Sequence, residues 1–424
     1  MNIAMLSYHT CPLATLGGKD TGGMNVYVRE ITRHLGAIGV HVDVFTRSQD
    51  EHVPHVLHDL GYGNRVVHIP AGPEHPLPKN VLVTYLPEFA KGVQEFVASK
   101  GIKYDLIHSH YWMSGVAGLE LKSIWKVPDI HMFHTLVLMK NRVAQSADEI
   151  EGQYRLEGEQ AVLQSTDRVI AATPAEMAQL QWLYQADVRK IVVIPPGVDT
   201  CRFYPIPPDE AKEYIGVPPC GRMILFVGRI EPLKGLDVLL ESIAQLRRQD
   251  SLGEYRFCLV VIGGEKETDN EMMSAEMARI QALREQYGLQ DLVAFIGKRG
   301  QDTLPYYYSA AEVVVVPSFY ESFGMVALEA MACGTPVVAS QVGGLAYLVQ
   351  DGVTGFTVPV DDPQALADRL MSLLRDAELR SKMGEQAVRY AQGYAWGNIA
   401  RRLLAVYSEL CGQGIGNPTG ASLI

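Results

Sequence analysis

Short apolar runs alternate with longer amphipathic stretches along most of the chain. In the first half, the runs predicted to be strands are 3–7, Val40–Phe45, Val66–Ile69, Leu106–Ile107, Ile130–Phe133, Val169–Ala172 and Ile191–Ile194. In the second half, they are Met223–Val227, Phe257–Ile262, Val293–Ile296, Val313–Val316, Val337–Ala339 and Phe356–Val358. Helical stretches lie between most of these runs, which is typical of βαβ units. The pattern therefore predicts parallel sheets covered by helices.

The two sets of runs are separated by Ile194–Asp199, a segment rich in turn-forming residues. A chain of 424 residues is also too long for one ordinary hydrophobic core. We therefore expect an α/β protein with two Rossmann-like domains facing each other across a cleft, where ligands bind. The first domain is predicted to cover residues 1–196 and the second 197–389. The end of the chain, 413–424, is rich in Gly, Pro and Ser and is predicted to be a loose tail.

Two carboxylates follow the buried run Val313–Val316, where a doubly wound sheet binds its ligands. Glu321 is expected in the loop after this strand, and Glu329 about one turn into a short helix that stops before Gly334. The backbone N–H groups of Gly324, Met325 and Val326 would then be free at a helix N-terminus and could bind an anion. This stretch predicts a site for a phosphate and a sugar.

Composition and charge exclude several classes of function. The chain is 47% hydrophobic and 20% charged, and its formal net charge of −11 argues against nucleic acid as a partner. No apolar run is long enough to span a bilayer, and Met1–Ser7 lacks the basic region of a signal peptide, so we expect it to be the first strand. The six cysteines show no metal-binding spacing and predict free thiols in a reducing, cytoplasmic setting.

Cations and glycines stand where a diphosphate could bind. Arg229 and Lys234 follow the strand Met223–Val227, and such a pair on one loop suits a diphosphate, although an exposed loop with solvated cations explains it as well. In the first domain, Gly17-Gly18 and Gly22-Gly23 bracket Lys19-Asp20, so the backbone could approach a ligand closely there. A flexible loop is the alternative.

Metal and dinucleotide chemistry lack their usual signatures. Neither GxGxxG after a first strand nor a P-loop motif is present, and no acidic DxD pair stands where a metal-bound nucleotide sugar would need it. Asp361-Asp362 is predicted to be a helix N-cap. The histidines His108, His110, His131 and His134 are close in sequence, but their pattern is weak for zinc. We therefore predict no metal, and place only His134 in the cleft.

Four further residues in the first domain can each bind an anion and lie near strand ends or helix starts, but separately they would count as surface residues. They are Lys79, Tyr111, Thr135 and Arg155.

Together these motifs resemble the retaining glycosyltransferases of family 4, which have the GT-B fold. The resemblance covers nearly the whole chain. It is carried by Gly22–Tyr27, Tyr104–Trp112, His134-Thr135-Leu136, Pro195–Asp199, Gly228-Arg229 with Lys234, and Glu321–Gly324 with Glu329. Within this family the glycine loop and the His-Ser-His-Tyr-Trp run are most similar to enzymes that transfer N-acetylglucosamine from a UDP-sugar to inositol phosphate in mycothiol synthesis. The segment Gly263–Asn270 is more similar to sucrose and sucrose-phosphate synthases.

The resemblance implies a role for each candidate residue. Helices at about 390–412, around Trp396, would return to the first domain. The residues implied in catalysis are His134, Arg229, Lys234 and Glu321. Those implied in binding the nucleotide sugar are Gly22, Gly23, Arg229, Lys234, Arg299, Glu321, Ser322, Phe323, Gly324, Met325, Val326 and Glu329, with the Arg299 backbone on uracil and Glu329 on the ribose hydroxyls. Those implied in binding the acceptor are Gly23, Asn25, Lys79, Tyr111, Thr135 and Arg155.

The implied activity is a retaining, metal-independent transfer of a hexose or N-acetylhexosamine from a UDP-sugar to a small phosphorylated acceptor, foremost an inositol phosphate. One alternative is transfer of glucose to fructose 6-phosphate. An alternative of another class is a non-catalytic nucleotide-sugar-binding protein. We expect no cofactor and no integral membrane partner, and a homodimer stays open. The choice between glucose and N-acetylglucosamine, or between UDP and ADP, does not follow from residue types.

Overall fold

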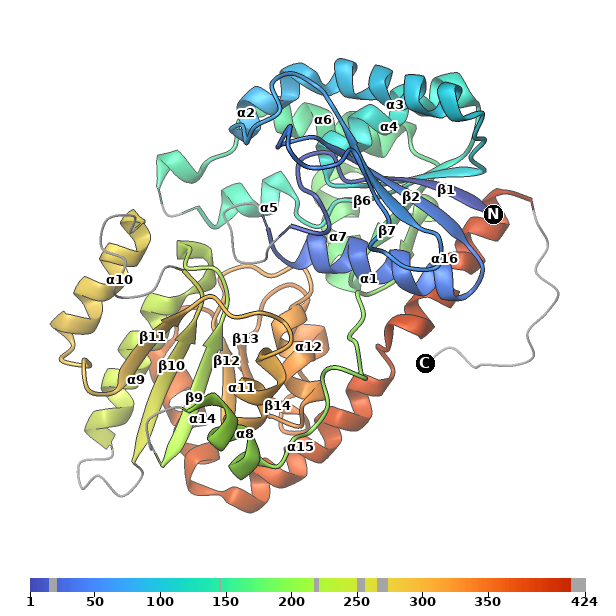
Figure 1. Ribbon diagram of the computed structural model, residues 1–424. Coiled ribbons are helices and arrows are strands. Elements are labelled where there is room, and N and C mark those ends of the chain that lie inside the picture. Colours follow the sequence, from blue (N-terminus) through green and yellow to red (C-terminus); the bar gives the residue numbers. More distant parts are fainter. Residues whose placement is uncertain (15–20, 145, 217–220, 250–255, 265–273, 413–424) are drawn as a thin grey trace.

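The computed structural model describes residues 1–14, 21–144, 146–216, 221–249, 256–264 and 274–412. The predicted Gly17-Gly18 and Lys19-Asp20 loop, most of the segment Gly263–Asn270 and the tail 413–424 lie outside the described residues. Two parallel-sheet domains are present, one above the other in Figure 1.

The first domain contains an eight-stranded sheet with the order β3-β4-β2-β1-β5-β6-β7-β8. Its strands are β1 Asn2–Leu6, β2 His41–Arg47, β3 Val56–Leu57, β4 Arg65–Ile69, β5 Leu106–His110, β6 Asp129–Met132, β7 Arg168–Ala171 and β8 Ile191–Val193. All neighbours pair in parallel except β3, which is antiparallel to β4. The helices are α1 Gly23–Ala37, α2 Lys79–Leu82, α3 Leu86–Lys100, α4 Trp112–Trp125, α5 Val137–Arg142, α6 Gln153–Ser165 and α7 Pro174–Tyr184, with 3₁₀ turns at Val83–Tyr85, Ala147–Glu149 and Val188–Lys190.

The second domain contains a six-stranded parallel sheet with the order β11-β10-β9-β12-β13-β14. Its strands are β9 Arg222–Val227, β10 Phe257–Ile262, β11 Val293–Gly297, β12 Val313–Val316, β13 Val337–Ser340 and β14 Gly355–Val358. The helices are α8 Pro208–Ile215, α9 Leu236–Gln249, α10 Ala275–Gln286, α11 Leu304–Ala310, α12 Met325–Ala332, α13 Leu345–Leu348, α14 Pro363–Arg375, α15 Ala377–Gln392 and α16 Trp396–Leu410, with a 3₁₀ turn at Pro232–Lys234.

Every strand that the apolar runs predict is present, with ends that differ by no more than a few residues. The two-residue strand β3 was not predicted, because two half-buried residues carry no detectable periodicity. Asp362 caps α14 as expected: its carboxylate accepts a hydrogen bond from the Ala365 N–H at 2.9 Å. Cys258 on β10 is disulfide-bonded, so the expectation of free thiols is wrong for this cysteine.

The last helix, α16, lies against α1 of the first domain (Figure 1). Its Tyr407 hydroxyl is 2.6 Å from Nδ1 of His108 on β5, and both residues are buried. Where the chain crosses between domains, Trp396 packs against Gly197 so closely that a Cβ there would lie 2.6 Å from the indole. The chain therefore passes between the domains twice. No helix in the described part of the chain is both long and apolar enough to cross a membrane.

Candidate active site

The loop after β12 ends in a backbone turn that only glycine adopts readily. Gly324, the N-cap of α12, has φ of 103°, and the helix begins at Met325. The first N–H groups of a helix have no partner within the helix, and the helix dipole adds partial positive charge there. The structure therefore places a helix terminus at the position predicted for an anion, directly after Glu321, Ser322 and Phe323 in the chain.

Lys234 reaches this terminus from the loop after β9. Its ammonium group is 2.6 Å from Oε2 of Glu321, and both side chains are 19% exposed. Glu231, on the same loop, lies 2.9 Å from the guanidinium of Arg229. Each predicted diphosphate cation thus has a carboxylate neighbour, so a bound diphosphate would exchange contacts with these carboxylates or share the cations with them.

The glycine loop of the first domain lies directly across from these residues. A Cβ on Gly23 would be 3.3 Å from Sδ of Met325, and one on Gly22 would be 3.9 Å from Nε of Arg229. The absence of side chains therefore lets the start of α1 approach the start of α12. The starts of α1 and α12 are about 300 residues apart in sequence. They meet at one cleft because, in a doubly wound sheet, the loops that bind ligands follow the carboxyl ends of the strands.

Glu329 is buried one turn into α12, where its Oε2 accepts a hydrogen bond from the Tyr308 hydroxyl at 2.8 Å. Burial raises the pKa of Glu329 to about 7, although Tyr308, Arg202 and Arg29 oppose the shift. It lines a cavity of about 10 Å³ between the domains, together with Gln301 and Trp396. A cavity of this size holds about one water molecule, so a nucleoside could enter only if the lining residues move apart.

Arg299 lies two residues before Gln301 on the loop after β11. Its Nε donates to the Tyr307 hydroxyl at 3.0 Å, and its guanidinium lies over the Tyr307 ring. The side chain is thus held against Tyr307 of α11. This position is near the cavity beside Glu329 but does not by itself identify a base.

His134 has φ of +62°, a conformation that residues other than glycine rarely adopt. Its Nε2 is 3.0 Å from Nδ1 of His110, and its ring packs against Tyr27. Burial lowers the pKa of His134 to about 3, so the imidazole is neutral at physiological pH. His108, His110 and His131 are buried in the sheet, and no group of metal ligands occurs in the residues described here.

The four predicted phosphate-binding residues come together although they belong to different elements. The Arg155 guanidinium lies 5.0 Å from the centre of the Tyr111 ring, and Nζ of Lys79 lies 5.7 Å from it. Nη2 of Arg155 donates to both the hydroxyl and the carbonyl of Thr135, at 3.0 and 3.1 Å. We call these four residues the phosphate clamp. Two cations and two hydroxyl groups at one place can bind a phosphate dianion.

Asn25 holds the glycine loop at the start of α1. Its Oδ1 accepts the Gly22 N–H at 2.9 Å, and its Nδ2 donates to Thr10 Oγ1 and the Cys11 carbonyl, both at 2.7 Å. The side chain is 1% exposed, so its amide is used to hold the glycine loop and is not presented to a ligand. The Asn25 side chain thus caps the start of α1, and its place near the acceptor stays a prediction.

Several residues around the site were not predicted. Glu151 and Glu159 both bind Arg155, and Lys140 shares the Glu151 carboxylate. Gln301 accepts hydrogen bonds from Arg29 of α1 and from Arg202. The bond from Arg29 joins the two domains. The spacing Glu151-x3-Arg155-x3-Glu159 is a sequence signal for ion pairs along one helix face, and it could have identified the first group. The contacts of Gln301 have no such signal.

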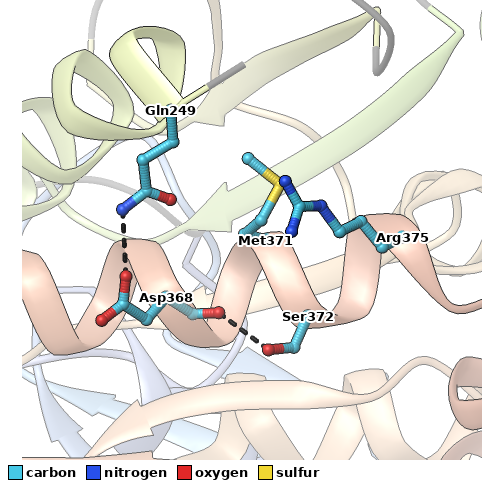
Figure 2. Close-up of a pocket in the computed structure, with 5 residues that line it drawn as sticks. All are labelled: Gln249, Asp368, Met371, Ser372 and Arg375. Atoms are coloured by element: carbon cyan, nitrogen blue, oxygen red, sulfur yellow. Dashed lines mark hydrogen bonds between the residues drawn. The ribbon is translucent and has the colours of Figure 1, made fainter.

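A larger hollow of about 420 Å³ lies elsewhere, between α9 and α14 (Figure 2). It is lined by Gln249, Asp368, Met371, Ser372 and Arg375. The Gln249 amide donates to Asp368 at 3.0 Å. This hollow contains none of the predicted site residues and is formed by the outer helices of the second domain.

Comparison with known proteins gives consistent matches over both domains. The family model described as Glycosyltransferase Family 4 matches residues 21–202, and the one described as Glycosyl transferases group 1 matches 209–390. D-inositol 3-phosphate glycosyltransferase 2 of Catenulispora acidiphila is 41% identical over 409 residues, 96% of this chain and 94% of that protein. D-inositol 3-phosphate glycosyltransferase of Kineococcus radiotolerans is 42% identical over 415 residues, 96% and 94% of the two chains.

Solved structures show the same fold. Sucrose-phosphate synthase from Thermosynechococcus elongatus has a TM-score of 0.88 and 36% identity, and the match covers 97% of this chain and 100% of that chain. HepE of Anabaena, solved with UDP and glucose, has a TM-score of 0.73 and 20% identity, with 96% and 100% covered. At that identity the second match supports the fold alone.

Proposed function

The chain belongs to glycosyltransferase family 4 and has the GT-B fold, and on this premise we propose that it is a retaining enzyme that transfers a hexose or N-acetylhexosamine from a UDP-sugar to an inositol phosphate. The relatives that share about two-fifths of its residues are named as glycosyltransferases of D-inositol 3-phosphate. We propose the cytoplasm as its location.

The observation that carries the proposed acceptor is the phosphate clamp. Arg155 is 1% exposed and Tyr111 5% exposed, so a phosphate bound there would be largely removed from water. Charge-assisted hydrogen bonds are strongest in such surroundings, and a cation pair with two hydroxyl donors matches a dianion. An acceptor without a phosphate would leave these groups without a ligand.

The donor half uses the helix terminus at Met325 with Arg229 and Lys234. In the proposed reaction the bond between the sugar C1 and the UDP oxygen breaks, and negative charge develops on the departing diphosphate. The helix terminus and the two cations stabilise that charge, so the proposed chemistry uses the chain's own cations and no metal. Glu321 and Glu329 accept hydrogen bonds from the hydroxyls of the sugar and the ribose.

The acceptor hydroxyl attacks C1 from the face that UDP leaves, and its proton passes to a leaving phosphate oxygen. His134 is neutral and its ring contacts those of Tyr27 and His110, so we assign it a hydrogen bond to the donor sugar and no role as nucleophile. The small cavity beside Glu329 requires the domains to part when the donor enters, and closure then aligns the substrates and excludes water.

A second candidate is transfer of glucose to fructose 6-phosphate. It is favoured by the structural similarity to sucrose-phosphate synthase over nearly the full length of both chains. The phosphate clamp suits this acceptor as well, because it recognises the phosphate and not the ring.

The test is an acceptor screen with the purified chain, in which UDP-glucose, UDP-N-acetylglucosamine and ADP-glucose are each combined with inositol 3-phosphate, inositol or fructose 6-phosphate. Nucleotide release and the transferred product are measured. The proposal predicts transfer to inositol 3-phosphate and little to inositol. Strong preference for fructose 6-phosphate would support the second candidate. Binding of a UDP-sugar without transfer or hydrolysis would instead indicate a non-catalytic binding protein.

A further inference from the structure

Arg155, the central cation of the phosphate clamp, has no unoccupied side in the structure. Its Nε donates to Glu159 at 2.9 Å, and its Nη2 donates twice to Thr135. Its Nη1 lies 3.0 Å from Oε1 of Glu151. With the Arg155 side chain only 1% exposed, a phosphate can reach the guanidinium only if a neighbouring group moves.

The two glutamates bound to Arg155 differ in how they are held. Glu159 is 0% exposed and accepts hydrogen bonds from the Val137 N–H at 3.1 Å and from the Tyr184 hydroxyl. The Glu151 side chain is 15% exposed, and Arg155 and Lys140 are the partners recorded for its carboxylate. Glu151 can therefore turn into solvent without leaving a buried backbone or hydroxyl group unpaired, whereas Glu159 cannot.

Glu151 carries a full negative charge at this position. Burial alone would raise the pKa of its carboxyl, but Arg155, Lys140 and Lys79 outweigh that effect and hold the pKa below its ordinary value. Its Oε1 lies 2.6 Å from Nζ of Lys140 and 3.0 Å from Nη1 of Arg155, which are the distances expected between a phosphate oxygen and its cations.

The backbone of Glu151 is fixed independently of its side chain. Its N–H donates to Oδ1 of Asn141 at 2.9 Å, and its carbonyl accepts from Nδ2 of Asn141 at 3.1 Å. Release of the carboxylate therefore does not require the chain to unfold at this point, and the side chain can return to the same position afterwards.

We propose that Glu151 occupies the position of the acceptor phosphate when the site is empty, and that acceptor binding exchanges its carboxylate for the phosphate on Arg155 and Lys140. This inference rests on the proposed function, because it assumes a phosphorylated acceptor. The exchange keeps a buried cation paired in both states, which matters because an unpaired buried charge is costly. It also lowers the affinity for phosphate, so the phosphorylated product is released more easily.

The experiment compares Glu151→Gln with wild type by titration calorimetry, using inositol 3-phosphate and inorganic phosphate as separate probes. Glutamine keeps the size of the side chain but removes the competing charge. We expect both probes to bind Glu151→Gln at least about tenfold more tightly, as removal of a competing charge-assisted hydrogen bond implies. Glu157→Gln is the matched control, since Glu157 is an exposed residue on α6, the helix that carries Arg155, and it should leave both affinities unchanged.

Glu159→Gln tests whether the two glutamates act differently. Glu159 orients Arg155 and does not compete with phosphate, so its loss should weaken binding of both probes. The proposal is overturned if Glu151→Gln binds inorganic phosphate no more tightly than wild type, or if Glu157→Gln tightens binding equally. A crystal structure of the wild-type chain with bound phosphate tests the exchange without a variant. In it, the Glu151 carboxylate should no longer contact the Arg155 guanidinium. If inorganic phosphate shows the exchange but inositol 3-phosphate does not bind, the proposed acceptor fails while this inference stands.

Discussion

At the scale of single residues, the site contains ionisable side chains that are buried away from water. Glu329 shows the cost most clearly, because its carboxyl is buried beside Tyr308 and its pKa is raised to about 7. A buried carboxylate with few partners lowers stability, and proteins retain such groups at functional sites. Arg155 shows the opposite arrangement, in which a buried cation is fully paired.

Glu329→Gln should make the chain more stable at pH 8. Between the ordinary carboxyl pKa of 4.5 and the folded value of about 7, the folded state holds more protons than the unfolded state, so the free energy of unfolding falls as pH rises. The shift corresponds to about 3 kcal/mol of lost stability above pH 7. Urea unfolding should therefore show a gain of up to about 3 kcal/mol at pH 8 and a much smaller gain near pH 5.

Donor turnover by Glu329→Gln should decrease at the same time, since an amide accepts fewer hydrogen bonds from ribose hydroxyls than a carboxylate does. A variant less stable than wild type at pH 8 would contradict the assigned effect of burial.

At the scale of elements, the proposed donor site depends on the start of α12. Gly324 has a left-handed backbone, and a Cβ at this position would lie 2.5 Å from Cδ2 of Leu345. A side chain would therefore push the loop and the first turn of the helix apart. The N–H groups that point toward the proposed diphosphate would move with them.

Gly324→Ala should weaken UDP binding by ~0.5–2 kcal/mol, the range known for anions at helix N-termini. Gly352→Ala is the control: Gly352 also has a left-handed φ, of 72°, but a Cβ there would have no neighbour within 4 Å. Both variants should lose ~1–2 kcal/mol of stability from backbone strain. Calorimetry with UDP should separate them, and equal UDP affinities in the two variants would show that the helix terminus does not hold the diphosphate.

At the scale of the whole molecule, the domains are joined by the paired chain crossings at Gly197 and Trp396 and by the contacts of Gln301. Oε1 of Gln301 accepts from Arg29 of the first domain and, at 3.1 Å, from Nη1 of Arg202. These bonds lie at the edge of the cavity beside Glu329. The bond from Arg29 crosses between the domains and is thus placed to hold them closed over a bound donor.

Gln301→Ala should increase the ratio of donor hydrolysis to transfer several-fold, because the lost hydrogen bond to Arg29 is worth about 1 kcal/mol of closure. Water then competes better with the acceptor for the sugar. The ratio is measured from nucleotide release with and without acceptor, and Gln286→Ala, on the exposed side of α10, is the control. An unchanged ratio would show that the Gln301 contacts do not control closure.

The sequence by itself determined every described strand of both sheets except β3, and it predicted the donor half of the site. Strand periodicity is local, and so are the turn at Gly324 and the spacing from Glu321 to Glu329, because consecutive residues decide them. The fold class and the family follow from these local patterns. The described strands β5 and β12 begin where their apolar runs begin.

The tertiary structure alone decided how the residues of the proposed acceptor site are arranged. Lys79, Tyr111, Thr135 and Arg155 come from four places in the first domain, and only folding of the parallel sheet brings them together. The structure also showed that Asn25 supports the glycine loop and that Glu151 already occupies Arg155. The four residues of the phosphate clamp are remote from one another in sequence, so no local pattern encodes their meeting, whereas the Glu151–Arg155 pair has a local i,i+4 spacing.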